Sequence, residues 1–202
     1  MNETSEKIDR RKQRTRQYLR DALMALIVEK GYDTISIQDI TDRANVSRPT
    51  FYLHYRDKEE LLLTSLEEVY DDLNARIGEI TPEGLMTDGN PMELVAFQHV
   101  AEFADFYRVM LGRRGVAAFI IRVQDYLAGV FRHHIEICYP TEYVPNVPVD
   151  IITYREAGAL IGTLSWWLEN GMPYSPTEMA KLHYKSSAQG MLWSLGITPD
   201  AS

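Results

Sequence analysis

The sequence predicts an all-α protein, and three observations support that fold class. Apolar residues recur at spacings of three and four along most of the chain, which is the period of an amphipathic helix. Residues of the kind that begin and end helices separate these stretches. No segment alternates between apolar and polar residues over the length of a strand.

Residues 11–79 predict four helices, of which the first and the last are long. The first has an apolar stripe over 19–27 and ends at Gly31, a favourable helix stop. The fourth begins after Asp57, an N-cap residue, and its apolar stripe extends to Ile77. The two helices between them must be short.

The second and third helices lie on either side of a tight turn. Ser36 caps the second helix and Ser47 caps the third, which has Pro49 in its first turn, where no N–H is needed. Asn45 suits the turn because asparagine tolerates a positive φ. Two short helices with this separation predict a helix-turn-helix, whose second helix enters the major groove of DNA.

The outer surface of the third helix has the side chains that DNA contacts require. We expect a small core of Ile37, Ile40, Val46 and Phe51 inside the motif. That core leaves the outside of the third helix to Arg48, Thr50, Tyr52, Leu53 and His54. Arginine can read guanine with two hydrogen bonds, tyrosine can contact thymine methyls, and threonine and histidine can donate to phosphate. For Tyr55 we expect local packing instead.

The distribution of charge supports a small DNA-binding module on a larger acidic body. The whole chain has a net charge of −8. Residues 1–60 contain 12 basic and 11 acidic residues, whereas the remainder contains 9 basic and 18 acidic residues. Seven of the basic residues lie within 7–20. A basic segment of this kind provides the electrostatic attraction that phosphates need.

Residues 15–73 resemble the DNA-binding domain of the TetR (tetracycline-repressor-like) family of transcriptional regulators. The resemblance is carried by the runs GYDTISIQDI at 31–40, ANVSRPTFYLHY at 44–55 and DKEEL at 57–61. Asn45 stands where the family usually has glycine, and asparagine can adopt the same left-handed turn.

The resemblance implies a function and roles for particular residues. It places the helix-turn-helix at 36–55 within a DNA-binding domain over 11–76. It also implies a cytoplasmic repressor that binds a palindromic operator in double-stranded DNA and is released by a small hydrophobic effector. The side chains expected to face DNA are Ser36, Gln38, Ser47, Arg48, Pro49, Thr50, Tyr52, His54 and, at a phosphate, Lys58.

Residues 77–202 predict a second, helical domain for regulation and dimerisation. Glycines and prolines within 81–91 separate it from the first domain. More loosely, 106–112 and 165–176 resemble a TetR subgroup that includes relatives of the dihydroxyacetone-kinase activator. Helices are expected over 92–111, then to about residue 137, and over 149–169 and 176–195, with a proline-rich loop at 139–149.

The resemblance implies that the last two helices pair with those of a second copy to form a homodimer. Small residues that permit close helix contact, and apolar residues beside them, support this independently. Internal packing without a dimer is the alternative. The residues expected at the interface are Ala157, Gly158, Ile161, Gly162, Leu164, Leu182, Gly190 and Trp193.

Large aromatic and apolar residues of the second domain are candidates for an effector pocket between the fourth helix and the middle helices. The same residues could form ordinary core. They are Phe103, Phe106, Tyr107, Met110, Phe119, Tyr126, Tyr154, Trp166 and Met172. An effector bound there would favour a conformation in which the fourth helix swings and the recognition helices no longer match the half-sites.

Other function classes find less support in the sequence. His133 and His134 are ligand types for a metal, but neighbouring helical residues point about 100° apart and do not converge. We therefore expect no enzyme activity, no cofactor and no metal. No segment is long and apolar enough for a membrane span, and a single cysteine, Cys138, fits a reducing cytoplasm. A transcriptional activator or co-activator that acts through a protein partner stays open as the alternative.

Overall fold

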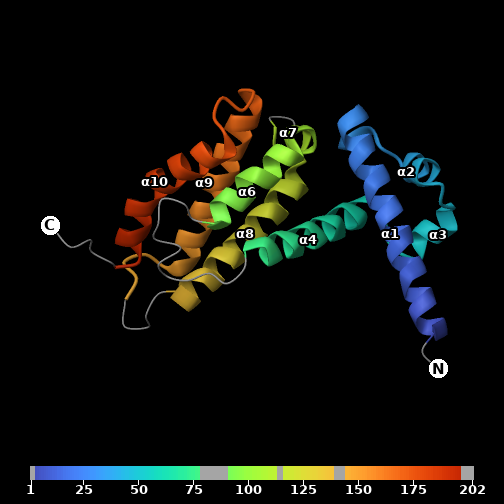
Figure 1. Ribbon diagram of the computed structural model, residues 1–202, viewed down its shortest axis with the longest axis horizontal. Helices are drawn as coiled ribbons and strands as arrows, with labels where there is room; N and C mark the ends of the chain where they lie inside the picture. The colour runs from blue at the N-terminus through green and yellow to red at the C-terminus, as the bar shows by residue number, and fades with distance from the viewer. Residues whose placement is uncertain (1–2, 78–90, 113–115, 139–143, 197–202) are drawn as a thin grey trace. The chain divides into compact units, whose positions relative to one another are not determined.

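The computed structural model describes residues 3–77, 91–112, 116–138 and 144–196 (Figure 1). Regular secondary structure within these ranges is entirely helical, so the predicted all-α class is confirmed. None of the described helices combines the length and apolar character that crossing a bilayer requires. The helices are α1 (Glu3–Lys30), the 3-10 helix η1 (Tyr32–Thr34), α2 (Ile37–Ala44), α3 (Arg48–Tyr52), α4 (Lys58–Ile77), α6 (Pro91–Glu102), α7 (Ala104–Leu111), α8 (Ala117–Cys138), α9 (Val149–Glu169) and α10 (Pro176–Ser194).

The chain divides into two compact units, Met1–Asp71 and Asp72–Ser202. The division falls inside α4, so this helix contributes residues to both units. The sequence placed the boundary between residues 76 and 77. A turn or a proline would mark a boundary in a sequence, but the middle of a continuous helix has no such signal.

The first unit packs α1, α2 and α3 around a small apolar core. Leu19, Leu23 and Ile27 from α1 are fully buried, together with Ile40 from α2 and Phe51 from α3. The first helix begins at Glu3, well before the predicted start near residue 11. Residues 3–11 have no apolar stripe, but their glutamate, lysine and arginine residues have a high intrinsic propensity for helix formation.

The second unit is built around α8 and α9, which pack along each other. The last helix, α10, packs on α6 and α9, and α7 packs on α9. The largest buried side chains here include Phe97, Phe119 and Trp167. The indole Nε1 of Trp167 donates a hydrogen bond to the carbonyl of Tyr174 at 2.9 Å, which ties the end of α9 to the start of α10.

One predicted helix, 92–111, is two helices in the structure. Phe103 departs from helical dihedrals, with φ −112° and ψ 35°, and separates α6 from α7. The helical hydrogen-bond pattern continues across this residue, since Phe103 N–H donates to His99 and Tyr107 N–H donates to Phe103, both at 3.1 Å. The break carries no glycine or proline, so the sequence prediction of one helix was wrong for lack of a local signal.

Candidate DNA-binding site

The start of α2 is fixed by reciprocal hydrogen bonds. Ser36 Oγ accepts from the N–H of Asp39 at 3.2 Å, and Asp39 Oδ2 accepts from the N–H of Ser36 at 2.7 Å. Lys30, the last residue of α1, places its Nζ 2.9 Å from Asp39 Oδ1. Hydrogen bonds from Ser36, followed by the one from Lys30, hold the pKa of Asp39 well below its usual range. These contacts orient the first helix of the motif against α1.

The turn between α2 and α3 depends on a left-handed residue. Asn45 has φ 52° and ψ 46°, as expected of a residue that replaces glycine in this turn. Its N–H donates to Asp42, and the N–H of Val46 donates to Thr41 at 2.9 Å. The turn therefore closes with its backbone groups paired, and it sets the direction of α3.

The third helix is short and is anchored from inside. Ser47 accepts a hydrogen bond from the N–H of Thr50, and Phe51 is completely buried in the core of the first unit. On the outside, Arg48 and Tyr52 lie one helical turn apart, and the guanidinium Nη2 donates to the phenol oxygen at 3.4 Å. Anchoring by Phe51 thus presents Arg48 and Tyr52 together to solvent.

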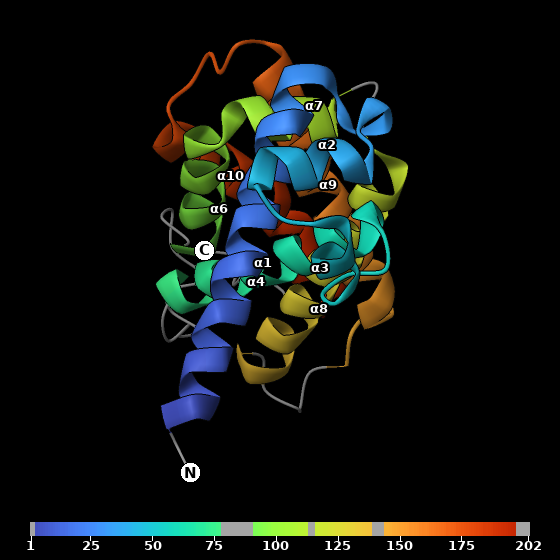
Figure 2. The same cartoon turned by 90° about the vertical axis from the view of Figure 1, so that its right-hand side faces the viewer.

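The predicted DNA-facing residues all lie on the first unit, whose α2 and α3 face the viewer in Figure 2. Half of the surface of Tyr52 is exposed. Six members of the set are exposed, and three are half-buried: Thr50, His54 and Lys58. Leu53, directly after α3, has 83% of its surface exposed, which places an apolar side chain beside Tyr52.

Lys58 has a role in the structure that the sequence prediction did not include. Its ammonium donates to the carbonyls of Tyr32 at 2.9 Å, Asp33 at 3.3 Å and Ile35 at 2.8 Å. The same nitrogen lies 4.4 Å from the centre of the Tyr32 ring. These contacts occupy all three ammonium protons, so the predicted phosphate contact requires Lys58 to leave at least one carbonyl.

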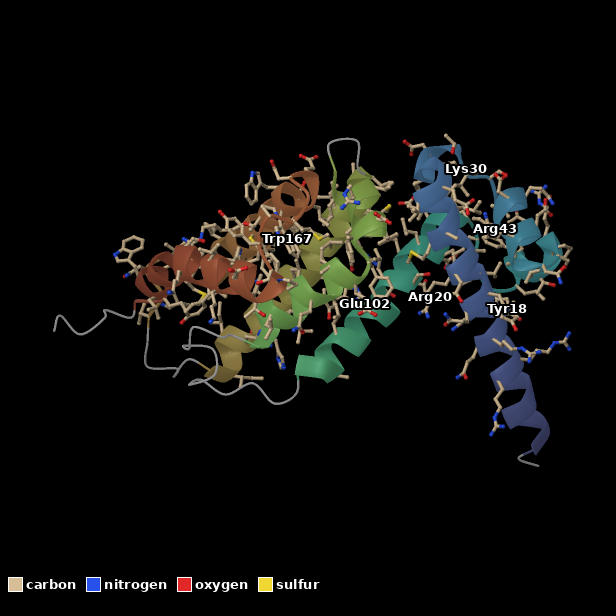
Figure 3. All side chains as sticks on the ribbon, turned by 45° about the horizontal axis from the view of Figure 1, so that its top comes forward. Tyr18, Arg20, Lys30, Arg43, Glu102 and Trp167 are labelled. Carbon is tan, nitrogen blue, oxygen red and sulfur yellow. The ribbon has the colours of Figure 1, made fainter. Side chains whose placement is uncertain are left out.

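His54 brings the recognition region into electrostatic range of α1. Burial, followed by the positive charges of Arg16 and Lys12, lowers the pKa of His54 from its ordinary value. Figure 3 shows nitrogen-tipped side chains along α1 on the N-terminal side of the labelled Arg20. The basic segment predicted from the sequence therefore lies on α1, and its charges act on His54, just after α3.

The predicted pocket residues divide by exposure. Phe106, Tyr107, Met110 and Phe119 are buried, and the rings of Phe106 and Phe119 meet edge to face with centres 5.8 Å apart. The Tyr107 hydroxyl lies 3.0 Å from His99 Nε2 in this cluster. Tyr126 and Met172 are half-buried, whereas Phe103, Tyr154 and Trp166 are exposed.

The predicted interface residues also differ in how exposed they are. Ala157 and Leu164 are buried inside the second unit, because the face of α9 that carries them packs within it. Gly158 and Ile161 are half-buried. The outward positions are Gly162 on α9 and Leu182, Gly190 and Trp193 on α10.

The histidine pair considered as a metal ligand set does not converge. His133 is exposed and His134 is buried, as expected of adjacent residues on α8. No three histidine, cysteine or acidic side chains gather at metal-binding distance in the described ranges.

A capped helix-turn-helix on a separate helical unit defines the class of helix-turn-helix transcriptional regulators. Residues 19–64 match the family model described as "Bacterial regulatory proteins, tetR family", and residues 90–188 match "Transcriptional regulator C-terminal region". The chain belongs to the TetR family of bacterial transcriptional regulators, a family of regulators and not of enzymes.

Individual relatives agree with this assignment. The HTH-type regulator YxbF of Bacillus subtilis (strain 168) is 45% identical over 76 residues, which are 35% of this chain and 20% of YxbF. A TetR regulator from Streptococcus agalactiae 2603V has the same fold, with 25% identity, a TM-score of 0.68 and coverage of 91% of this chain and 98% of that one.

The fold also resembles that of the dihydroxyacetone kinase operon activator DhaS, at 20% identity and a TM-score of 0.53, over 90% of this chain and 96% of that one. Matches to the first relatives by sequence span only 20% to 44% of those proteins.

Proposed function

We propose that this protein is a homodimeric repressor that binds a palindromic operator through α3 and releases it when a small hydrophobic effector binds. The observation that carries the proposal is the outer face of α3. Arg48 and Tyr52 stand together there on a helix that Phe51 anchors from inside. A short, rigidly held helix with an outward arginine and tyrosine has the shape and the donors that the major groove accepts.

Leu53 adds an apolar side chain to the surface that Arg48 and Tyr52 present to DNA. An exposed leucine gains nothing in water, but beside Tyr52 it can contact the methyl group of thymine. We propose that Arg48, Tyr52 and Leu53 select bases. The serine, threonine and glutamine side chains around them would hold the phosphates on either side.

Dimerisation is proposed through the outward faces of α9 and α10. A Cβ placed on Gly190 of α10 would lie 3.9 Å from the guanidinium of Arg155 on α9, so these faces adjoin. They carry small residues next to exposed Leu182 and Trp193, with exposed fractions of 49% and 62%. Such a face suits a self-complementary interface around a two-fold axis, which matches the symmetry of a palindrome.

Repression, as opposed to activation, is proposed from proteins whose DNA-binding domains are similar to this one. IcaR of Staphylococcus epidermidis, a negative regulator, is 35% identical over 51 residues. FasR of Mycolicibacterium smegmatis is an activator and is 38% identical over 52 residues. Repression is the usual action of this family, and release from the operator is the simplest coupling to an effector.

The effector is proposed to act on the buried aromatic cluster of α7 and α8. Phe106, Met110 and Phe119 offer apolar contact there, and Tyr107 with its His99 partner offers a polar group. Because α4 carries residues of both units, a change in its position would reach the helix-turn-helix. Ligand titration of an operator complex tests this part of the proposal, and it fails if no compound that binds the protein lowers operator affinity.

The DNA-binding part of the proposal is tested with duplexes enriched by selection from random DNA. Arg48→Ala and Tyr52→Ala each remove one base contact from both half-sites of the dimer. At about tenfold to a hundredfold per contact, each should weaken binding roughly a hundredfold or more. Tyr18→Ala is the matched control, because Tyr18 on α1 has the same 50% exposure as Tyr52. Equal affinity of Tyr52→Ala and Tyr18→Ala contradicts the placement of the recognition helix. No enrichment by the folded protein contradicts DNA reading and favours a co-activator that acts through a protein partner.

A further inference from the structure

A single stripe along α1 changes from apolar to basic. Lys12, Arg16, Leu19, Leu23 and Leu26 follow one another at spacings of four, three, four and three residues, which keeps them on one face of a helix. The three leucines are buried in the core of the first unit. Lys12 and Arg16 are exposed, although they continue the same face.

The basic part of this stripe extends past the core of the first unit. With a rise of about 1.5 Å per residue, Arg16 lies roughly 4.5 Å and Lys12 roughly 10 Å beyond Leu19 along the helix. Among the described residues, no hydrogen bond or ion pair engages either side chain. Asp9 is the one acidic residue within 7–20, so the segment keeps its positive charge.

The stripe faces the side on which α3 lies. The leucines of the stripe pack toward the core that Phe51 of α3 also enters. The charges of Arg16 and Lys12 act on His54, two residues after α3 ends at Tyr52. A duplex that accepts α3 in its major groove would therefore bring a phosphate strand near this part of α1.

We propose that Lys12 and Arg16 bind the phosphate backbone of the same duplex that α3 reads, as a second contact that positions the recognition helix. The inference rests on the proposed function and adds residues to its DNA-binding site. Charge complementarity selects the occupant: two exposed cations about 6 Å apart along a helix suit a strand that carries one phosphate per 3.4 Å of duplex axis. Phosphate contacts of this kind fix register and orientation without reading bases.

The test compares two double variants of the full-length protein. Lys12→Gln with Arg16→Gln removes the proposed contact. Arg10→Gln with Arg14→Gln removes the same charge at the same spacing from the opposite side of α1 and serves as the control. All four side chains are exposed, so both variants should keep the helix content and unfolding transition of the unmodified protein.

The readout is the slope of log K against log salt concentration on an enriched duplex. Loss of two phosphate contacts in each protomer of a dimer should reduce the magnitude of the slope by about 3 to 4 for the Lys12 and Arg16 variant. Its affinity should fall at least about tenfold near 0.1 M salt, and its base preferences should not change. The control variant should show a clearly smaller change in slope.

The outcomes separate the two proposals. If the unmodified protein enriches a palindrome and the two double variants have equal slopes, the α1 contact is overturned while DNA reading by α3 stands. If the unmodified protein binds no duplex, both fail. If the Lys12 and Arg16 variant changes the selected bases as well as the slope, a backbone contact is overturned in favour of base reading by α1.

Discussion

Lys58 provides a test of how the helix-turn-helix is held in place. Replacement by methionine keeps the length and apolar stem of the side chain but removes the ammonium. Two of its three acceptors, the carbonyls of Tyr32 and Ile35, are partly buried and lie at 2.9 and 2.8 Å. Burial, followed by nearby Glu59, Asp57 and Asp33, raises the pKa of Tyr32 to about 12, so its ring stays a neutral partner for the cation.

The expected loss follows from these contacts. Each hydrogen bond from a charged donor to a partly buried carbonyl contributes about 1 to 1.5 kcal/mol after allowance for solvent. The contact with the Tyr32 ring adds about 0.5 kcal/mol. Lys58→Met should therefore lower the free energy of unfolding of the first unit by about 3 kcal/mol.

Urea denaturation, followed by circular dichroism, measures this loss. Lys30→Met is the control, because it removes one surface ion pair with Asp39 and should cost less than about 1 kcal/mol. A loss of under about 1 kcal/mol for Lys58→Met would refute the structural role. If that small loss came with a salt slope of DNA binding reduced by about 1 per protomer, Lys58 would instead be the phosphate contact predicted from the sequence.

Three further predictions concern the turn, the histidines and the dimer. Asn45→Gly should preserve stability, whereas Asn45→Val should cost about 1–2 kcal/mol in urea denaturation because a β-branched residue resists the left-handed region. The pKa values of His54 and His134 are lowered by burial first, so the unfolded chain binds more protons and the free energy of unfolding should fall below about pH 6.5. Unfolding curves at pH 7.5 and 5.5 check this, and His134→Gln should reduce the difference. Trp193→Asp should shift the protein from dimer to monomer in sedimentation without unfolding it, and an unchanged dimer would exclude this face of α10.

Local signals explain why the helix-turn-helix could be predicted. The caps at Ser36 and Ser47 and the left-handed turn at Asn45 each act within four residues, and each is present as expected. The identity of the buried anchor, Phe51, followed from the same short-range pattern. Sequence reasoning works here because the chemistry that sets the motif is close along the chain.

Features that depend on distant contacts were not predictable in the same way. Lys58 meets carbonyls 23 to 26 residues before it, and no short pattern records that pairing. Its position in the first turn of α4 was a usable signal, because a cation is unfavourable at a helix N-terminus unless another partner holds it. The division of the pocket residues into buried and exposed sets depends on how α7, α8 and α9 pack, which periodicity alone does not determine.

Selection of binding sites from random duplex DNA near physiological salt shows whether α3 of a symmetric dimer reads DNA. We expect an enriched palindrome, with two half-sites separated by about one helical turn or a multiple of it, and loss of that enrichment in the Arg48→Ala protein. Enrichment of a single asymmetric site, or no enrichment by a folded protein, would rule out DNA reading by a symmetric dimer.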